Sequence, residues 1–463
     1  MKFILFALLS FLIVPCAKGS RPNVLVVFID DMGWGDFSCF GNRSAKTPHI
    51  DKLAQEGVRF EQFYVNSPIC SPSRVAISTG QYPQRWKITS YLAHRKQNEH
   101  RGMSQWLSPK APMLARSLQK SGYATGHFGK WHMGGQRDVD DAPEITEYGF
   151  DKSLTNFEGM GPKLLPLTLK PGQKNPGRIW DKAERLGDGV RWMLRSKITE
   201  GFVDEAMPFI DKAAKAGKPF YVNLWPDDVH SPFWPPVNKW GDTKRELYLS
   251  VLQEMDRQLG KLFNYINGSE KLRNNTLVLV CSDNGPEKGA GQSGPFRGYK
   301  THLYEGGVRS SLVAWGPGLI KEGRQVNRSS VFSAIDLVPT LLKITGTKYP
   351  QGIEFDGECL PEVLLGKSSE SRKLPLFFRR PPDRDSFYGD NDLPDLAIRK
   401  GKWKLLCEYD GSEVELYNLD NDRGEKKNLA QMNAAIVSSM KDQVIKWHLS
   451  MPPDNGHKLV KKK

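Results

Sequence analysis

Cysteine is scarce in this chain of 463 residues, which contains six, and no two of them form a Cys-x-x-Cys pair. The wide spacing excludes a small scaffold stapled by disulfides, and the lack of a paired-cysteine knuckle excludes the common structural zinc sites. The sequence has no internal repeat and no helix-turn-helix, RNA-recognition or zinc-finger signature. We therefore expect a globular protein and no nucleic-acid partner.

Long hydrophobic runs are also missing after the first few residues. Residues 3–14 are apolar, but they are fewer than the about 18–20 needed to span a bilayer. A small-x-small pattern at residues 17–19 follows, so we expect residues 1–19 to be a signal peptide. A lipoprotein signal at Cys16 fits poorly because Pro15 precedes it. The expected protein is secreted or periplasmic, or lysosomal in a eukaryote, without stable membrane insertion.

Acidic residues are outnumbered, because 66 lysines and arginines face 52 aspartates and glutamates, which gives a formal charge of +14. In an exported protein this balance favours an anionic partner such as a sulfated or carboxylated glycan or an anionic surface. Alternatively, the positive charge serves only the solubility of the protein and binds no partner.

Predicted strands and helices alternate along most of the chain. Apolar, β-branched runs predict buried strands at residues 23–29, 59–65, 123–130, 219–225, 276–282 and 311–316. Helical patterns lie between them, at residues 47–57, 111–122, 201–217, 245–267 and 333–346. This alternation predicts an α/β fold with a mostly parallel sheet and helices on both faces.

The pattern changes near residue 365, where short strands and one helix at about residues 432–448 replace the long alternation. We predict a large domain over residues 20–364 and a smaller C-terminal α/β subdomain over residues 365–463. Residues 157–178 are rich in glycine and proline and are predicted to form a long loop, which is often functional.

Acidic side chains follow two of the predicted strands at the sheet edge where ligands bind. The first strand runs into Asp30 and Asp31, and the strand at residues 276–282 runs into Asp283 and Asn284. An all-oxygen set of this kind suits Ca²⁺ or Mg²⁺ better than zinc. Each residue alone is more readily a loop cap, but three carboxylates at one edge would repel each other without a cation.

Five cysteines follow the predicted signal peptide, and an odd number leaves at least one of them unpaired. Cys70 is open to three interpretations: a half-cystine, a buried structural thiol or a modified catalytic residue. It precedes Ser71, a predicted helix cap, and Pro72 in the first turn. The start of a helix attracts anions, and Arg74, one turn on, can point to the same place. The pattern predicts an anion-binding corner that contains a nucleophile.

The run CSPSR at residues 70–74 resembles the C-x-P-x-R signature of type I sulfatases. Further segments are similar to that family and occur in its order: DDMGWGD, GKWHMG, HSPF, SDNG and GPFRGYKTHLYEGGVR. The N-acetylgalactosamine-6-sulfatase and arylsulfatase A types are the most similar. The resemblance implies an alkaline-phosphatase-like fold and a sulfuric ester hydrolase that acts on a sulfated carbohydrate.

The resemblance also implies a modified nucleophile. A formylglycine-generating maturation enzyme would oxidise Cys70 to formylglycine, whose aldehyde hydrates to a gem-diol. One hydroxyl would attack sulfur and displace the alcohol, and the other, once deprotonated, would expel sulfate and restore the aldehyde.

The remaining roles follow from the same resemblance. One Ca²⁺ would be held by four residues: Asp30, Asp31, Asp283 and Asn284. Arg74 would fix the diol, and Lys130 and Lys300 would bind the sulfate oxygens. His230 would protonate the leaving alcohol, and His132 would deprotonate the remaining hydroxyl.

Plainer interpretations compete with these roles. Lys130 alone is usually a solvated lysine, and His230 before a proline can simply shape a turn. The other histidines are expected to be structural or exposed, and Cys281 is expected to be a core thiol. Four tryptophans could line a sugar subsite or lie in the core: Trp34, Trp225, Trp234 and Trp240.

Two rival functions remain. A phosphatase or phosphodiesterase of the same fold would use serine or threonine with two zinc ions, which disagrees with CSPSR and the all-oxygen set. A non-catalytic protein that binds sulfated glycans would keep Cys70 as a thiol, which leaves the matches at the catalytic positions unexplained.

Overall fold

The computed structural model of the chain describes residues 21–180, 182–320, 323–381, 383, 390 and 393–456. The predicted signal peptide and Cys16 lie outside the described residues. Within this part of the chain, no helix is both long and apolar enough to cross a membrane.

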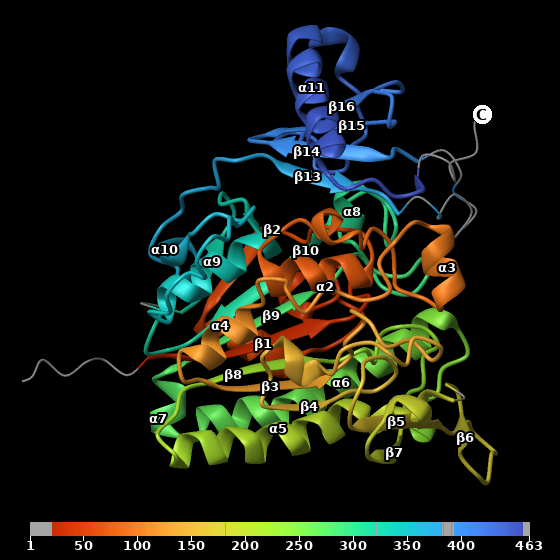
Figure 1. Cartoon of the computed structure of the whole chain (residues 1–463), viewed down its shortest axis with the longest axis vertical. Coiled ribbons are helices and arrows are strands. Elements are labelled where there is room, and N and C mark those ends of the chain that lie inside the picture. Colours follow the sequence, from red (N-terminus) through yellow and green to blue (C-terminus); the bar gives the residue numbers. More distant parts are fainter. Residues whose placement is uncertain are drawn as a thin grey trace, which may run out of the picture.

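A nine-stranded sheet forms the centre of the molecule (Figure 1). Its strands are β1 (Asn23–Ile29), β2 (Val58–Tyr64), β3 (Ala124–Gly129), β4 (Lys152–Leu154), β8 (Phe220–Trp225), β9 (Thr276–Ser282), β10 (Arg309–Trp315), β11 (Gln325–Asn327) and β12 (Phe332–Ser333). The order is β11-β2-β10-β9-β1-β8-β3-β4, with β12 beside β2. All pairs are parallel except those of β10, which is antiparallel to both β2 and β9. The predicted mostly parallel sheet is confirmed.

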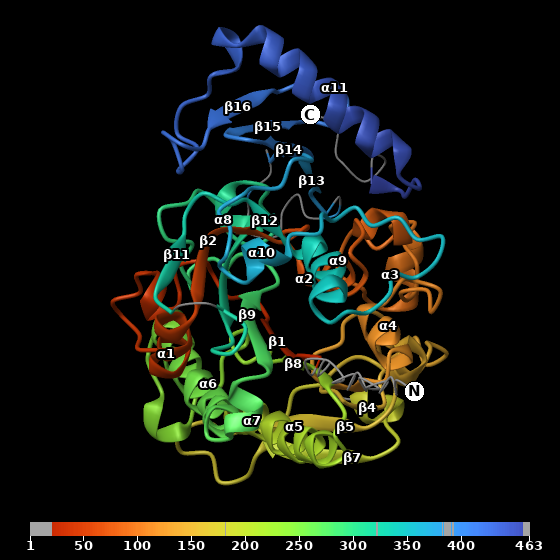
Figure 2. The ribbon, with the colours of Figure 1, turned by 90° about the vertical axis from the view of Figure 1, so that its left-hand side faces the viewer.

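Helices cover both faces of this sheet, as predicted (Figures 1 and 2). They are α1 (Pro48–Glu56), α2 (Cys70–Thr79), α3 (Arg95–His100), α4 (Leu114–Lys120), α5 (Ile198–Lys215), α6 (Lys244–Asn267), α7 (Glu270–Arg273), α8 (Glu305–Val308), α9 (Ala334–Ile344) and α10 (Pro361–Leu364). Short 3-10 turns are η1 (Ser38–Phe40), η2 (Pro83–Trp86), η3 (Ile145–Tyr148), η4 (Ala183–Leu186), η5 (Arg195–Lys197), η6 (Val237–Lys239) and η7 (Ala430–Met432).

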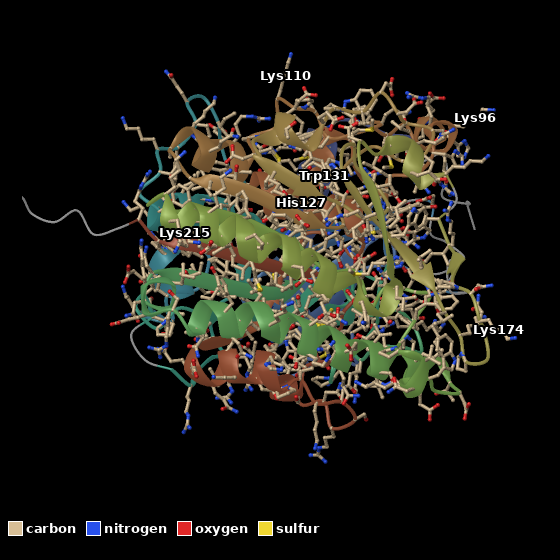
Figure 3. The ribbon with its side chains drawn as sticks, turned by 90° about the horizontal axis from the view of Figure 1, so that it is seen from below. Lys96, Lys110, His127, Trp131, Lys174 and Lys215 are labelled. Carbon is tan, nitrogen blue, oxygen red and sulfur yellow. The ribbon has the colours of Figure 1, made fainter. Side chains whose placement is uncertain are left out.

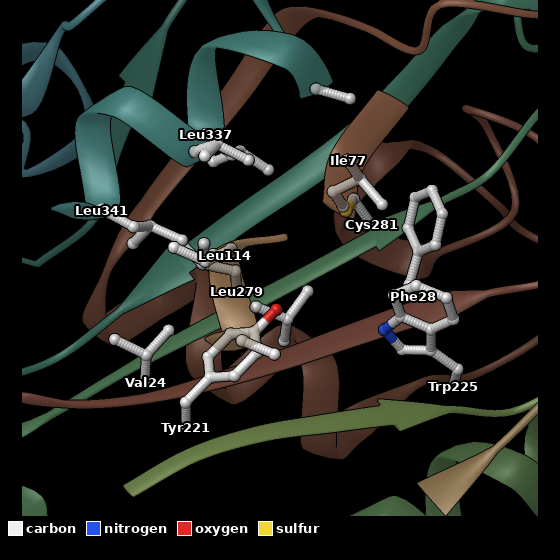
Figure 4. Close-up of a cluster of buried hydrophobic side chains, with 14 of the residues drawn as sticks. Val24, Phe28, Ile77, Leu114, Tyr221, Trp225, Leu279, Cys281, Leu337 and Leu341 are labelled. Atoms are coloured by element: carbon white, nitrogen blue, oxygen red, sulfur yellow. The ribbon is translucent and has the colours of Figure 1, made fainter. Parts of the chain in front are cut away.

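The central strand β1 shows why both faces need cover. All seven of its residues are buried, and successive side chains point to opposite faces. Val24 and Phe28 pack toward α2, α4 and α9; Val24 lies near Tyr221 and Phe28 next to Trp225, both of β8 (Figure 4). Leu25 and Val27 pack on the other face, toward α1, α5 and α6. Cys281 lies in the first of these cores and is fully buried, which confirms its prediction as a core thiol.

The C-terminal part forms a separate antiparallel sheet with its own core, at the top of Figure 1. Its strands are β13 (Leu376–Arg379), β14 (Leu396–Lys400), β15 (Trp403–Cys407) and β16 (Glu415–Asn418), and α11 (Ala434–Ser450) packs against it. The predicted C-terminal subdomain is therefore present, whereas the boundary at residue 364 stays a prediction.

Buried ion pairs join this subdomain to the large domain. Lys404 Nζ of β15 lies 3.0 Å from Glu305 Oε1 and 2.9 Å from Glu425 Oε1. Glu305, in α8, also accepts hydrogen bonds from Tyr64 and Arg309. The subdomain thus fixes the segment that follows Lys300.

The predicted loop at residues 157–178 is wrong in part. It contains β5 (Lys163–Thr168) and β6 (Gly177–Arg178), which form a three-stranded sheet with β7 (Val190–Leu194) in the order β6-β5-β7. β5 pairs in parallel with β7, which lies more than twenty residues further on. Local sequence does not reveal such a pairing, because a proline inside β5 and glycines around it are typical of loops.

Candidate functional site

A cluster of carboxylates lies where β1 and β9 end. β1 and β9 are paired in parallel and in register from Asn23 to Ile29, so the residues after them meet at one edge. Carboxylate oxygens of Asp30, Asp31 and Asp283 lie within 4.8 Å of one another, and all three side chains are fully buried. The structure brings these predicted metal ligands together.

Asn284 completes the cluster. Its Nδ2 donates to Asp31 Oδ1 at 2.8 Å and to the carbonyl oxygen of Gly285. Its Oδ1 is buried and has no hydrogen-bond partner among the described residues. A buried oxygen without a donor next to three carboxylates fits a hard cation, so the residues present match the predicted calcium or magnesium site.

Three cations surround the carboxylates. Arg74 Nη2 lies 3.0 Å from Asp30 Oδ1 and 2.8 Å from Asp283 Oδ2. Lys130 Nζ lies 2.6 Å from Asp30 Oδ2, and Lys300 Nζ lies 2.6 Å from Asp31 Oδ2. The predicted sulfate-binding lysines and the predicted metal ligands are therefore direct neighbours.

These pairs determine the charge states. Burial raises the pKa of Asp30, but Lys130, His230 and Arg74 outweigh burial and hold it well below its usual value. Burial likewise opposes the charge of Asp31, yet Lys300 lowers its pKa overall. Burial and the nearby Asp30 carboxylate raise the pKa of Asp283 well above its usual value. A bound cation would lower the pKa of Asp283, because it compensates the repulsion from Asp30.

Cys70 begins helix α2, as predicted, and only 2% of its surface is exposed. All ten residues of α2 are buried, which fixes the direction of its first turn. The predicted cap is wrong: Ile69 occupies the N-cap position, and Ser71 Oγ instead accepts a hydrogen bond from the Leu92 N–H at 2.9 Å. The helix ends at Gly80, whose φ of 68° is left-handed.

His132 lies in the same cavity wall and contacts a residue that the sequence did not single out. Its Nε2 is 3.1 Å from the carbonyl oxygen of Leu92 and 3.2 Å from Glu158 Oε1. Its Nδ1 has no hydrogen-bond partner among the described residues. Burial lowers the pKa of His132 to about 4, although Glu158 acts in the opposite direction.

His230 lies next to Asp31 and Lys300. Its Nδ1 is 2.7 Å from the carbonyl oxygen of Ser231, and its Nε2 is 3.5 Å from both Asp31 Oδ2 and Lys300 Nζ. Burial lowers its pKa. Since a carbonyl oxygen only accepts, Nδ1 carries a proton here.

The backbone at this site takes an unusual conformation at three residues. Asp31, His132 and Thr301 have φ values of 55°, 54° and 76°, in the left-handed region that most side chains avoid. Each lies in the site or next to a site residue, which is where strained backbone tends to gather.

A cavity of about 370 Å³ joins these groups. Cys70, Lys130, His132, His230 and Lys300 all line it. Arg74 and the carboxylate cluster do not contribute to its lining and lie behind these residues. The remaining lining residues are Ile69, Tyr91, Leu92, Gln136, Phe157, Glu158, Trp180, Asp227, Ser231 and Glu287.

Sequence reasoning missed several of these. Glu158 is the only acidic residue in its Gly-rich stretch, which was the one available signal. Asp227 follows β8 at the expected sheet edge, but the sequence does not reveal that Arg195 Nη1 pairs with it at 2.5 Å. Trp180 lies just after the segment at residues 157–178 whose structure was mispredicted.

Burial and contacts distinguish between the alternatives that the sequence left open for the tryptophans, His302 and the cysteines. Trp34 and Trp225 belong to the hydrophobic cores, whereas Trp234 and Trp240 are only partly buried. His302 lies 3.4 Å from Asp390 and outside the cavity lining. The five described cysteines, Cys39, Cys70, Cys281, Cys359 and Cys407, are all free thiols. The half-cystine interpretation of Cys70 is therefore wrong.

Comparisons with known proteins agree with this geometry. Residues 22–347 match the family described as Sulfatase, and residues 294–449 match the family described as N-sulphoglucosamine sulphohydrolase, C-terminal. N-acetylgalactosamine-6-sulfatase of Homo sapiens is 31% identical over 371 residues, which cover 78% of this chain and 68% of that protein.

Two further proteins match over almost their whole length. N-acetylgalactosamine-6-O-sulfatase of Bacteroides thetaiotaomicron is 27% identical over 502 residues, which cover 92% of this chain and 93% of that protein. The crystal structure of Ps i-CgsB in complex with k-i-k-neocarrahexaose has a TM-score of 0.75 and 26% sequence identity, with 92% of both chains covered. This likeness confirms the predicted alkaline-phosphatase-like fold.

Proposed function

Because the chain belongs to the type I sulfatase family, a family of sulfuric ester hydrolases, we propose that it is an exported enzyme that removes sulfate from a sulfated carbohydrate. Its nucleophile would be formylglycine made from Cys70, and its metal would be one calcium ion. The observation that carries the proposal is the cavity itself, in which Cys70 lies among two lysines and two histidines, in front of a carboxylate cluster. Residues 20–364 would form the catalytic domain and residues 365–463 the C-terminal subdomain.

The conversion of Cys70 belongs to maturation. The Cβ–Sγ bond and one Cβ–H bond break, sulfur leaves as hydrogen sulfide, an oxygen atom from water becomes the carbonyl oxygen, and two protons and two electrons are removed, the electrons passing to an oxidant supplied with the maturation enzyme. The aldehyde, once hydrated, supplies a hydroxyl that attacks sulfur and a second hydroxyl that later expels sulfate. Since Cys70 is almost fully buried, we expect conversion before the chain completes its fold.

Asp30, Asp31, Asp283 and Asn284 would hold the calcium ion. Four oxygen donors with three negative charges suit it, and Asn284 Oδ1 has no other described partner. When bound, the ion would act as a Lewis acid and a template for the sulfate group. Arg74 holds Asp30 and Asp283 together and carries positive charge beside Cys70, where it would fix the hydrated aldehyde.

Lys130 and Lys300 would bind the sulfate oxygens from two sides of the cavity. The neighbouring carboxylates raise the pKa of each lysine above its usual value, although burial opposes them. Both lysines therefore keep their positive charge near neutral pH, and they line the cavity at the position of Cys70. Fixed positive charge of this kind stabilises the negative charge that develops as sulfate is transferred and released.

His132 would be the base, and Glu158 its positioning residue. Both groups near Nε2 are acceptors, so the proton of the neutral imidazole lies on Nε2. This leaves the lone pair on Nδ1, the nitrogen without a described partner, free to take a proton from the remaining hydroxyl. Glu158 thus has the function that an orienting carboxylate has in a catalytic triad.

His230 would be the acid that protonates the leaving alcohol. Its Nδ1 proton is held by the Ser231 carbonyl oxygen, so Nε2 is the nitrogen that faces the cavity and exchanges the proton. The nearby Asp31 favours the protonated form of His230, and burial opposes it. A leaving group that needs no protonation, such as a nitrophenolate, would depend little on this residue.

Release of sulfate from a sulfated sugar tests the proposal. Protein made with a formylglycine-generating enzyme should release sulfate, and Cys70→Ala should not. Cys70→Ser is the matched control, because serine can form a sulfate ester but cannot expel sulfate by forming an aldehyde. We expect at most one turnover from it. Phosphate release from the matching phosphate ester at a similar rate would favour the phosphatase alternative instead.

A further inference from the structure

A strongly basic segment borders the cavity and has no part in the chemistry described above. Residues 163–197, here called the basic lobe, contain nine lysines and arginines and three acidic residues. Their formal charge of +6 is a large share of the +14 of the whole chain. The lobe comprises β5, β6, β7, η4 and η5 (Figure 1).

Most of this charge is exposed and available. Lys170, Lys174, Arg178, Lys182 and Arg185 are exposed, and no carboxylate of the described residues lies within ion-pair distance of any of them. Lys174 projects from one end of the molecule, and Lys215 lies at the other end (Figure 3). Unpaired exposed cations on one segment create a local positive potential that attracts polyanions.

The lobe is also part of the cavity wall. Trp180, which lies in the lobe, lines the cavity and packs on Phe157 with ring centroids 4.7 Å apart. Behind it, Arg195 of the lobe is buried against Asp227, another lining residue. A molecule that leaves the cavity past Trp180 therefore meets the lobe.

Two aromatic side chains continue this surface. Lys170 Nζ lies 5.4 Å from the ring centroid of Trp234, three residues after the lining residue Ser231. Trp234 in turn contacts Trp240, with ring centroids 5.6 Å apart, and both rings are partly exposed. Of the four tryptophans singled out in the sequence, these are the two that lie outside the hydrophobic cores. Aromatic rings with a polar edge suit the apolar faces of sugar rings, and the cations beside them suit sulfate groups.

The size and charge of the cavity indicate what lies outside it. A volume of about 370 Å³ is at the lower end for ligand pockets, so it holds little more than one sulfated sugar unit. Glu158, Asp227 and Glu287 line it and would repel further negative groups. Additional sulfates or carboxylates of a longer substrate are therefore favoured on the lobe and disfavoured in the cavity.

We propose that the basic lobe, together with Trp234 and Trp240, binds the neighbouring units of a sulfated polysaccharide whose terminal or exposed sulfated unit occupies the cavity. This inference rests on the proposed function and extends it from a sulfated sugar to a sulfated polymer. The lobe supplies affinity and orientation, and the cavity supplies the chemistry.

The test uses a variant of the lobe and a matched control. Lys170→Gln, Lys174→Gln and Arg178→Gln together remove three exposed positive charges from the lobe. The control removes three exposed lysines that precede β3 and β8, at the opposite edge of the sheet: Lys120→Gln, Lys212→Gln and Lys218→Gln. Both variants change the net charge equally.

Two measurements are compared in the mature protein. One is turnover of 4-nitrocatechol sulfate, a substrate small enough to lie within the cavity, whose lining does not include Lys170, Lys174 or Arg178. The other is inhibition of that turnover by decasaccharides of chondroitin sulfate and heparin, with unsulfated hyaluronan as the carboxylate-only reference. Calorimetric binding of the same decasaccharides needs no turnover and is measured in parallel.

We expect the lobe variant to raise the inhibition constant of at least one sulfated decasaccharide about tenfold, and to leave KM and kcat for 4-nitrocatechol sulfate unchanged. The control variant should change neither the inhibition constants nor the kinetic constants for 4-nitrocatechol sulfate. Hyaluronan should bind weakly to the unaltered protein and to both variants. Trp234→Ala should weaken the same decasaccharide without a change in charge.

Equal effects of the lobe and control variants, or no effect of the lobe variant, would overturn the inference, as would loss of turnover of the small substrate in the lobe variant. Absence of turnover in the unaltered mature protein would instead contradict the proposed function. In that case calorimetric binding by the lobe still decides the inference.

Discussion

His132 and Glu158 face each other in the cavity wall, and their contact gives the most direct test of a single residue. Glu158 is 2% exposed, its Oε1 is 3.2 Å from His132 Nε2, and its Oε2 has no described hydrogen-bond partner. Burial of a carboxylate with only one of its oxygens in contact with a polar partner is unfavourable for folding. The presence of Glu158 at this position therefore indicates a function. The expected function is to keep the proton of His132 on Nε2.

We expect Glu158→Leu to lower kcat by about 100-fold, because the base is then free to adopt the wrong tautomer. Glu158→Gln is the matched variant: its amide oxygen still accepts from Nε2, so kcat should fall only a few-fold.

The same variant tests the pH dependence. The carboxylate of Glu158 raises the pKa of His132, so removal of this carboxylate should lower the pKa of His132 further. The acid limb of the kcat/KM profile, which we assign to His132, should then move to lower pH in Glu158→Gln. An acid limb that stays in place would contradict the assignment.

The carboxylate cluster gives a second prediction. Asp283→Asn should lower kcat by about 1000-fold or more and should abolish the recovery of activity when Ca²⁺ is added after chelation. Asp228→Asn is the control, since this carboxylate is also buried at a strand end but pairs with Thr199 outside the cluster. It should keep the response to Ca²⁺. Full activity of the unaltered protein after exhaustive chelation would show that the reaction needs no metal ion and would contradict the assignment of the cluster as a metal site.

Several of the site's residues could be predicted from the sequence because they stand directly at the end or start of a readable element, whereas Lys300 lies in a loop and was identified only through the family resemblance. Asp30 and Asp283 follow continuous apolar strands, and Cys70 opens a helix marked by Pro72. Glu158 could not be predicted, because it lies between elements and is brought to His132 by the fold alone. Ser71 was predicted as a cap, but its hydroxyl bonds to a loop 21 residues away, which no local pattern shows.

Helix α2 is the element on which Cys70 depends. It is buried on all sides, and its C-terminal end is fixed by Gly80, whose N–H bonds to the Ala76 carbonyl oxygen. A Cβ at Gly80 would lie 2.9 Å from both Phe355 and Val338. The left-handed φ of 68° and this crowding together make the position specific for glycine.

Gly80→Ala should therefore lower the free energy of unfolding by about 1–3 kcal/mol, visible as a lower Tm. Gly217→Ala is the control: Gly217 has a φ of 67° just beyond helix α5, and nothing lies within 4 Å of its Cβ position. Gly217→Ala should lower the free energy of unfolding only by the cost of placing alanine at a left-handed φ, about 1 kcal/mol. Equal losses in the two variants would mean that packing around Gly80 contributes nothing.

Elements with strong local patterns were predictable, and those that form through distant pairing were not. Strands β1, β8 and β9 are short apolar runs that read directly as buried strands, and all are confirmed. β5 and β7 are partners only because the chain between them folds back, and the proline inside β5 favours a loop. The same limit applies to the basic lobe, whose charge is visible in the sequence but whose place at the cavity is not.

At the scale of the whole molecule, buried ionisable groups make stability depend on pH. His127 of β3 is fully buried near Trp131 (Figure 3), and the ring centroids of Trp131, Phe150 and Trp225 lie 4.9–5.4 Å from its own. Burial lowers its pKa from 6.5 to about 3. The folded state therefore holds this histidine neutral at pH values where the unfolded chain protonates it.

Because the folded pKa is the lower one, the contribution of His127 is complete above about pH 6.5 and is lost as the pH falls from there to about 3. His127→Phe should make the loss of unfolding free energy with acid shallower by up to about 1.4 kcal/mol per pH unit in this window. Exposed His100→Asn should leave the slope unchanged. Parallel curves for His127→Phe and the unaltered protein, measured by denaturant unfolding from pH 7 to 4, would contradict this reasoning.

The central claim, that Cys70 becomes the aldehyde nucleophile of a sulfatase, is tested most directly by the mass of one tryptic peptide. The peptide comprises residues 60–74 and is taken from protein produced together with a formylglycine-generating enzyme. The account predicts the mass of an aldehyde in place of the Cys70 thiol, captured by a hydrazide, in a fraction that rises with sulfate release. An unmodified thiol in protein that still releases sulfate would contradict it.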